Sequence, residues 1–391
     1  MISSFLKDLR PEALAAPSSG IVEVFDYGRT RAGLLPLWVG EGDRATPDFI
    51  RKAATLSLEQ GETFYTYQAG IPPLREAIAA YLSRLYDTSV LPDRIFVTNG
   101  GMHALQIAVR LVAGSGDEVI VPTPAWPNFR GALAVAGATT RDVTMRFGND
   151  GWQLDLADLE AAVTPRTRAL CINSPANPTG WTATREELAA MLDLARRHGL
   201  WIIADEIYGQ FSFDAPRAPS FRDVMSADDR VMFVQTFSKN WAMTGWRIGW
   251  LEAPPALSQT IINLIQYSSS GTPVFAQRAG IAALEHGDGF IDEQRDMARV
   301  NRDVLMHAFS TEPGIRAAAP PGAFYLFFGI EGASDTRQLA FDLIDHANVG
   351  LAPGTAFGSG GEGFLRLCYL RKTADIAEAA KRLVAAIRAR R

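Results

Sequence analysis

The residue best suited to chemistry is Lys239, in the run TFSKNWAMTGWRIGW at residues 236–250. The chain has only five lysines, and the other four lie in charged or near-terminal stretches. Lys239 instead has aromatic and small neighbours and no acidic residue close to it in the sequence. Burial of such a lysine lowers its pKa, so that its amine becomes a usable nucleophile or base. The alternative is a lysine at a loop edge with its ammonium group in water.

Two further groups of polar residues follow apolar runs that are typical of strands. Asn173 and Asn177 lie in NSPANPTG, where a cis bond before Pro178 is expected, although an ordinary turn also suits this composition. Asp205 and Glu206 follow the run LWIIA. A buried carboxylate needs a cationic partner, unless one of the two acids caps a helix. A protonated ring nitrogen would be a suitable partner for Asp205.

A third group could hold an anion near Lys239. Thr236, Ser238 and Arg247 offer two hydroxyl groups and a guanidinium group, which commonly bind phosphate. Gly101 ends the run TNGG at the start of a helical pattern, where backbone amides can approach an anion, although a plain helix cap also explains the glycines. Together, an anion cradle, a buried acid, an amide and a lysine suit pyridoxal 5'-phosphate held as a Schiff base.

The elements that must position these residues alternate along the chain. From about residue 94, short apolar runs precede longer helical patterns, at 94–98, 117–121, 168–173, 200–205 and 231–236. Such alternation predicts parallel βαβ units with helices on both faces of the sheet. Ligands of these folds bind at the C-terminal ends of the strands, where the polar residues above are found.

The fold class that we predict is α/β with two domains. A large domain over residues 41–289 would hold a mostly parallel sheet sandwiched by helices and would bind the cofactor. A long polar helical pattern begins near residue 290 and leads into a mixed stretch that ends in another helix. Residues 1–40 and 290–391 would therefore form a smaller α+β domain.

Composition excludes several classes of protein. A net charge of −5 over 391 residues gives no basic footprint for nucleic acid. No apolar run approaches a membrane span, and the N-terminus lacks the apolar stretch of a signal peptide. The five histidines show no metal-ligand spacing, and Cys171 and Cys368 are too few for a disulfide framework. We expect a cytoplasmic protein with no metal, no nucleic acid and no membrane partner.

Four motifs in chain order resemble those of the class I and II aminotransferases, which are fold-type I pyridoxal phosphate enzymes. They are YTYQAGIPPLR at 65–75, NSPANPTG at 173–180, DEIY at 205–208 and SKNWAMTGWRIG at 238–249. The last resembles the lysine signature of the family in order and spacing, and the resemblance covers nearly the whole chain. It implies transfer of the amino group of an L-amino acid to a 2-oxo acid.

The resemblance implies three catalytic residues. Lys239 would form the Schiff base and move a proton between substrate and cofactor. Asp205 would keep the pyridine nitrogen protonated. Tyr208 would hydrogen-bond the phenolic oxygen of the ring, together with Asn177.

The resemblance also implies how the rest of the cofactor and the substrate are held. The residues around the phosphate would be Gly101, Met102, Thr236, Ser238 and Arg247. Trp126 would stack on the ring, and Tyr65 would reach the phosphate of the neighbouring subunit, which implies a homodimer with shared active sites. Arg366 would bind the substrate carboxylate, helped by Gly40 and Asn177. Alternatively, Trp126 and Tyr65 are core or interface aromatics, and Arg366 belongs to a structural ion pair.

Departures from the family pattern bear on the amino-acid donor. Several relatives that act on acidic substrates have a lysine where this chain has Met102. Three aromatic side chains could add surface to the pocket, namely Trp38, Tyr67 and Trp241. These features favour a neutral or aromatic donor, whereas Arg29 and Arg31 could meet an acidic side chain.

Other functions are compatible with parts of this pattern. The same cofactor and fold serve β-elimination lyases, decarboxylases and cyclising synthases. A cofactor-binding sensor module would need a DNA-binding domain, and the family match begins within the first forty residues. The run GSGGEG at 358–363 fits the dinucleotide fingerprint of a nicotinamide dehydrogenase. That run precedes a strand-like stretch instead of following one, which indicates a loop.

Overall fold

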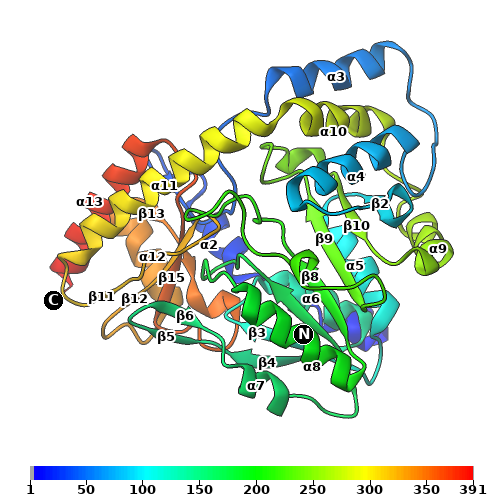
Figure 1. Ribbon diagram of the computed structural model, residues 1–391. Helices are drawn as coiled ribbons and strands as arrows, with labels where there is room; N and C mark the ends of the chain where they lie inside the picture. Colours follow the sequence, from blue (N-terminus) through cyan, green and yellow to red (C-terminus); the bar gives the residue numbers. More distant parts are fainter. Residues whose placement is uncertain (1–3, 391) are drawn as a thin grey trace.

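The large sheet contains seven strands in the order β2-β10-β9-β8-β7-β3-β4 (Figure 1). The computed structural model describes residues 4–390. The strands of this sheet are β2 (Ile95–Thr98), β3 (Glu118–Thr123), β4 (Thr139–Thr144), β7 (Thr167–Asn173), β8 (Trp201–Asp205), β9 (Val231–Thr236) and β10 (Gly249–Glu252). Strands β9, β8, β7, β3 and β4 pair in parallel, and β10 lies antiparallel between β2 and β9. The predicted α/β fold with a mostly parallel sheet is confirmed.

Helices cover both faces of this sheet, as its apolar strands require. On one face, α5 (Gly101–Val112), α6 (Pro127–Ala136) and α9 (Ser258–Ser268) pack against side chains such as Cys171 and Ile203. The next residues along the same strands point to the other face, because side chains alternate along a strand. That face is covered by α4 (Pro72–Tyr86), α8 (Arg185–His198) and α10 (Val274–His286).

The second sheet is antiparallel and has four strands. Its order is β11 (Ile315–Arg316), β12 (Tyr325–Ile330), β15 (Phe364–Cys368) and β14 (Ala352–Pro353). The long helix α11 (Asp288–Ser310) and α13 (Thr373–Ala389) lie side by side in yellow and red in Figure 1, with α12 (Thr336–Ala347) near them. The run at 358–363 lies before β15, in the loop expected of it.

The N-terminal part of the chain joins this second sheet region. Strand β1 (Leu35–Pro36) pairs in parallel with β13 (Val349–Gly350), and α2 (Gly20–Gly28) packs near α12. The sequence suggested such packing, although the domain boundaries at residues 41 and 290 stay a prediction. The remaining elements are α1 (Pro11–Leu14), α3 (Asp48–Glu59), α7 (Leu156–Ala161), β5 (Arg146–Gly148), β6 (Gly151–Gln153) and the 3-10 helices η1 (Ser4–Asp8), η2 (Pro92–Arg94), η3 (Phe221–Asp223), η4 (Thr244–Trp246), η5 (Pro255–Leu257) and η6 (Gly354–Phe357).

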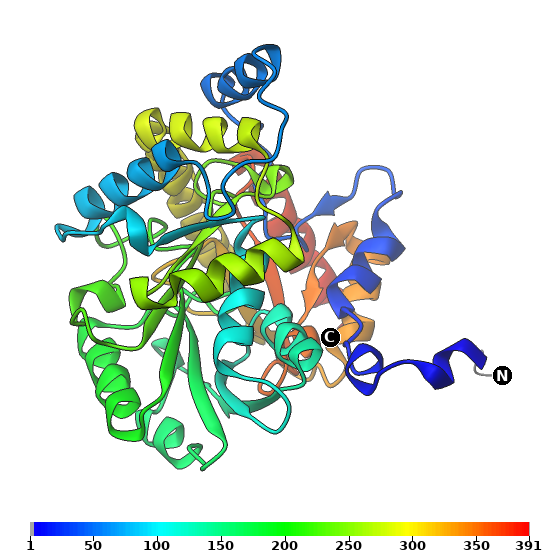
Figure 2. The same ribbon diagram turned by 90° about the vertical axis from the view of Figure 1, so that its right-hand side faces the viewer.

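Two segments project from the rest of the chain. Figure 2 shows the N-terminal segment before α2 extending away at one side and α3 standing out at the top. Apolar side chains are exposed on both, among them Leu6, Leu14 and Leu56. Across residues 4–390, no helix combines the length and the apolar character needed to cross a bilayer.

Candidate active site

One cavity of about 490 Å³ lies at the C-terminal ends of β7, β8 and β9. The carboxyl ends of parallel strands meet at one edge of a sheet, so residues far apart in the sequence gather there. Twelve of the thirteen predicted site residues line this cavity. They are Gly40, Gly101, Met102, Trp126, Asn177, Asp205, Tyr208, Thr236, Ser238, Lys239, Arg247 and Arg366.

Lys239 projects into this cavity from the turn after β9. Its Nζ atom donates a hydrogen bond to the carbonyl oxygen of Gly40 at 2.7 Å. Burial lowers the pKa of the amine from 10.5 to about 8, against the opposing charges of Cys368 and Glu41. A backbone carbonyl compensates an ammonium charge less than a carboxylate does, so the neutral amine is accessible near neutral pH.

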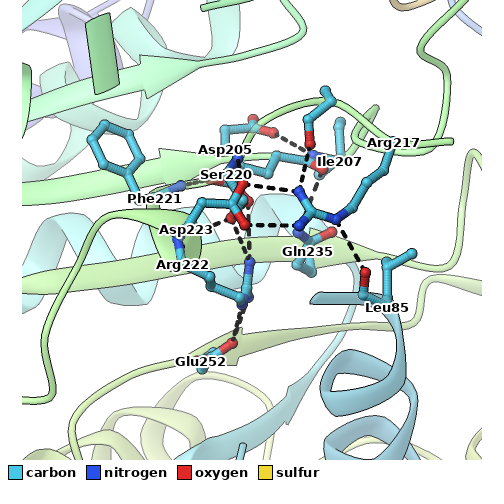
Figure 3. Close-up of polar contacts among 12 residues, drawn as sticks. Leu85, Asp205, Ile207, Arg217, Ser220, Phe221, Arg222, Asp223, Gln235 and Glu252 are labelled. Carbon is cyan, nitrogen blue, oxygen red and sulfur yellow. Dashed lines mark hydrogen bonds and ion pairs between the residues drawn. The ribbon is translucent and has the colours of Figure 1, made fainter. Parts of the chain in front are cut away.

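Asp205 ends strand β8 and is 2% exposed. Its Oδ1 atom accepts a hydrogen bond from the backbone amide of Ile207 at 3.3 Å (Figure 3). Burial raises the pKa of this carboxyl to about 7, although that amide and Lys239 favour the ionised form. The negative charge of Asp205 is thus poorly compensated within the chain, and a cation placed beside it in the cavity would stabilise the carboxylate.

Arg366 and Asn177 form a polar pair in the cavity wall. The guanidinium Nη1 of Arg366 donates to Asn177 Oδ1 at 2.9 Å, and Nη2 donates to the carbonyl oxygen of Trp38. Arg366 also lies over the rings of Tyr325 and Phe357, at 4.8 and 4.9 Å from their centroids. Among the described residues, no hydrogen-bond partner meets its buried Nε atom.

Tyr208 completes this side of the cavity. Its hydroxyl group lies 2.7 Å from that of Tyr325, in hydrogen-bond contact. Both side chains are buried, and burial raises the pKa of each phenol, so both remain neutral donors in the physiological range. The Asn177–Pro178 bond is cis, as predicted.

An anion cup lies at the N-terminal end of α5. Gly100 has φ +82°, and a Cβ atom there would lie 2.6 Å from Arg247 Nη2, so only glycine allows this approach. Thr236 Oγ1 donates to Ser238 Oγ at 2.8 Å, which places both hydroxyl groups together. Free helix amides, two hydroxyl groups and a guanidinium group suit a phosphate. Arg247 is exposed in the single chain.

Trp126 and Met102 form another part of the wall. Trp126 precedes α6 and packs edge-on against Phe129, with ring centroids 5.6 Å apart. Asn128 Nδ2 contacts Met102 Sδ at 3.6 Å. The indole is only partly buried and lines the cavity.

Tyr65 is the predicted site residue that the cavity does not include. It is 94% exposed and lies with Phe64 beside residues 269–275, in a separate surface pocket. Within one chain it contributes nothing to the cavity.

The expected contribution of three aromatic residues to the cavity is wrong within one chain. Trp38 and Trp241 are 1% and 0% exposed and pack in the core, and Tyr67 is 64% exposed, away from the cavity. Of the two arginines with no assigned place, Arg29 forms an ion pair with Asp26 and Arg31 with Asp345, at the surface. Neither lines the cavity of its own chain.

Several cavity residues were not predicted. Ile21 and Val22 from α2, Val39 and Tyr325 contribute apolar or hydroxyl surface. The sequence carries little signal for the α2 residues, because their place depends on the pairing of β1 with a strand more than 300 residues later. Tyr325 could have been noticed as a hydroxyl at the start of an apolar strand.

Comparisons with known proteins agree with this geometry. Residues 33–383 match the family Aminotransferase class I and II. YugH of Bacillus subtilis (strain 168), which is named only provisionally as an aminotransferase, is 35% identical over 98% of this chain and 97% of its own. The aspartate aminotransferase of Pyrococcus horikoshii is 32% identical over 94% of both chains.

A solved structure extends the similarity to the fold. The aromatic aminotransferase of Pyrococcus horikoshii OT3 superposes with a TM-score of 0.87 at 31% identity, covering 94% of this chain and 99% of that chain. The chain therefore belongs to the class I and II aminotransferases, and the family predicted from its motifs is confirmed. It is a transferase that moves an amino group from an amino acid to a 2-oxo acid.

Proposed function

We propose that this aminotransferase uses pyridoxal 5'-phosphate, bound in the 490 Å³ cavity with Lys239 as its point of attachment. The observation that carries the proposal is the Lys239 amine, whose pKa is lowered to about 8 and which shares the cavity with a buried Asp205 and an anion cup. When bound, this cofactor supplies an aldehyde that condenses with amines and a ring that accepts electrons.

The residues present fit each part of that cofactor. Asp205 would hold the ring nitrogen in its protonated form, and the gain of a cationic partner would offset the burial of the carboxylate. Tyr208 and Asn177 would donate hydrogen bonds to the phenolic oxygen. Trp126 would stack on the ring. The residues that would bind the phosphate are Gly101, Met102, Thr236, Ser238 and Arg247.

Lys239 and Arg366 would act on the substrate. The place of Arg366 in the cavity wall, together with the backbone of Gly40, supports its role in binding the α-carboxylate. A Cβ atom at position 40 would clash with the hydroxyl of Tyr325, so this wall depends on glycine. With a pKa near 8, the Lys239 amine is suited to take and return the proton of the substrate α-carbon near neutral pH.

We propose a neutral or aromatic amino-acid donor. The cavity wall includes the apolar side chains of Ile21, Val22 and Val39. The two arginines of the cavity are already engaged, because Arg366 donates a hydrogen bond to Asn177 and Arg247 lies at the anion cup. Among the described residues that line the cavity, no further arginine or lysine is left for a second carboxylate, because Lys239 is assigned to the cofactor. The chain is similar both to a relative named for aspartate and to one named for aromatic substrates, so these names do not distinguish the donors. The proposed donor is therefore supported by the residues of the cavity wall.

We also propose a homodimer in which Tyr65 reaches the phosphate of the neighbouring subunit. Phe64, Tyr65, Tyr67 and Tyr267 are 82%, 94%, 64% and 89% exposed, and large aromatic surface of this kind marks an interface. The exposed Arg247 leaves the anion cup open in one chain, where a partner could cover it. The free cysteines, Cys171 and Cys368, suit the proposed cytoplasmic location.

The experiment that tests the proposal is the visible absorption spectrum of the purified protein, followed as single amino acids are added without an acceptor. Conversion of the cofactor band by neutral or aromatic amino acids, with no ammonia or carbon dioxide released, is the expected result. Release of either product would favour an elimination, decarboxylation or ring-closing reaction. Absence of a band even after pyridoxal phosphate is added would refute the cofactor. Faster conversion by aspartate would refute the proposed donor.

A further inference from the structure

A buried cluster of charged residues lies close to Asp205, which lines the cavity (Figure 3). The guanidinium group of Arg222 donates from Nη1 to Glu206 Oε2 at 3.0 Å and from Nε to Glu252 Oε2 at 3.2 Å. The side chains of all three residues are at most 4% exposed. Arg94 approaches Glu252 at 3.6 Å and adds a second positive charge.

This cluster joins three separate elements of the large sheet region. Glu206 follows β8, Arg222 belongs to η3, and Glu252 ends β10. Arg222 also lies 3.6 Å from the ring centroid of Phe233 and 4.8 Å from that of Tyr86. Removal of charged groups from water is costly, and a protein with apolar side chains in place of a buried ion pair is often at least as stable. Stability alone is therefore a weak reason for their presence.

Glu206 is covalently joined to Asp205, and the two side chains lie in different surroundings. Asp205 lines the cavity, whereas the Glu206 carboxylate accepts from Ser220 Oγ at 2.6 Å and from the Phe221 amide at 3.0 Å, within the buried cluster. The backbone between them is also held, since Asn173 Nδ2 donates to the Asp205 carbonyl oxygen at 3.0 Å. Rotation of this chain segment would move both carboxyl groups together.

We propose that Arg222 is a positioning residue, which anchors the Glu206 carboxylate behind β8 and thereby aims the Asp205 carboxyl at the ring nitrogen of the cofactor. The inference rests on the proposed use of pyridoxal phosphate. Arg222 would affect the contact between Asp205 and the ring nitrogen of the cofactor, and it would not affect phosphate binding at the anion cup. Loss of Arg222 would leave the Glu206 carboxylate buried without its cationic partner. Either the chain segment at 205–206 would rearrange so that this carboxylate reaches water, or the carboxylate would bind a proton.

The test compares two ligands on the Arg222→Met variant. One is pyridoxal phosphate, and the other is its 1-deaza analogue, which has carbon in place of the ring nitrogen. We expect the dissociation constant of pyridoxal phosphate to rise about tenfold and kcat to fall about 10- to 100-fold, as for a small misplacement of a catalytic group. Binding of the deaza analogue should change less than about threefold, because Asp205 has no ring nitrogen to meet. Equal weakening of both ligands would overturn the proposal.

A double-mutant cycle provides a second readout. In an Asp205→Asn background, Arg222→Met should change kcat by less than about threefold, since the interaction through which it acts is already lost. The full effect in both backgrounds would contradict a role exerted through Asp205.

Arg217→Met is the matched control for the loss of a partly buried arginine. Arg217 makes its ion pair with Asp223 at 2.7 Å and donates to the Leu85 carbonyl at 3.0 Å. Its hydrogen bonds go to Asp223 and to the carbonyl oxygens of Leu85 and Ala218, and none goes to Glu206 or Asp205. Its loss should therefore change stability but not the preference for pyridoxal phosphate over the analogue. The same loss of preference in this variant would count against the proposal.

A milder variant covers the case in which Arg222→Met does not fold. Arg222→Lys keeps the charge but cannot reach both carboxylates with a planar fork, so an intermediate loss of the same preference is expected. An unchanged preference in a folded Arg222→Lys and in Glu206→Gln would overturn the proposal. A wild-type protein that binds no pyridoxal phosphate would instead refute the proposed cofactor, which keeps the two failures distinct.

Discussion

Replacement of Asp205 by asparagine should stabilise the cofactor-free protein at neutral and alkaline pH. Burial raises the pKa of this carboxyl from 3.8 to about 7 in the folded chain. Between these values the folded state binds a proton that the unfolded state has released. The contribution of Asp205 to stability is therefore fully present below about pH 4 and is lost as the pH rises through about 7.

The size of this loss follows from the two pKa values. They differ by about three pH units, and each unit corresponds to about 1.36 kcal/mol, so the loss is about 4 kcal/mol above pH 8. Asparagine cannot ionise, and its Oδ1 atom can still accept from the Ile207 amide. The free energy of unfolding of Asp205→Asn should thus match that of the wild type at pH 4 and exceed it by about 4 kcal/mol at pH 8.

Urea denaturation of the cofactor-free proteins at fixed concentration, from pH 4 to pH 8, would measure this difference. Asp229→Asn is the control, since Asp229 accepts from two nitrogens of Arg196, which lowers its pKa to about 2, and its replacement should destabilise the protein at pH 8. When pyridoxal phosphate is added, the wild type should become more stable than Asp205→Asn, because only the wild type offers the ring nitrogen a carboxylate. A less stable Asp205→Asn at pH 8 without cofactor would refute the reasoning.

Four further changes test other parts of the site. Lys239→Ala should abolish turnover and leave any bound cofactor removable by gel filtration, as its absorption would show. Gly100→Ala should weaken pyridoxal phosphate about tenfold but not pyridoxal, measured by fluorescence titration, because the new Cβ would displace Arg247 and strain a left-handed backbone. Tyr65→Phe should weaken the cofactor about tenfold by loss of one charged hydrogen bond, and an equal affinity would argue against a shared site. Met102→Lys should raise kcat/KM for aspartate about tenfold relative to phenylalanine.

The sequence predicted the residues at the strand ends because a local rule applies there. Asn177, Asp205 and Lys239 each follow an apolar run, and the parallel arrangement of such runs brings their C-terminal ends together. The antiparallel strand β10 was not foreseen, since nothing in its four residues distinguishes its direction. Its insertion between β2 and β9 is nonetheless what brings Gly249 close to Gly100 at the anion cup.

Residues whose position depends on distant pairing were harder to predict. Trp38 is an aromatic residue two positions before the predicted Gly40, yet its ring packs in the core near Gly28, and its carbonyl oxygen accepts from Arg366. Sequence proximity to a site does not determine which way a side chain points. Ile21 and Val22 line the cavity through the packing of α2, which no local pattern reveals.

The two central ionisable groups are shifted in opposite directions by the same cause. Burial lowers the pKa of Lys239 to about 8 and raises that of Asp205 to about 7, so each group resists its charged form. An aldehyde and a basic ring nitrogen on one small molecule would meet both needs, because the first requires a neutral amine and the second gives the carboxylate a cation. The opposite charge of an ion-pair partner acts against this effect of burial. The two shifts therefore indicate that no charge partner in the chain outweighs the burial of Lys239 or of Asp205.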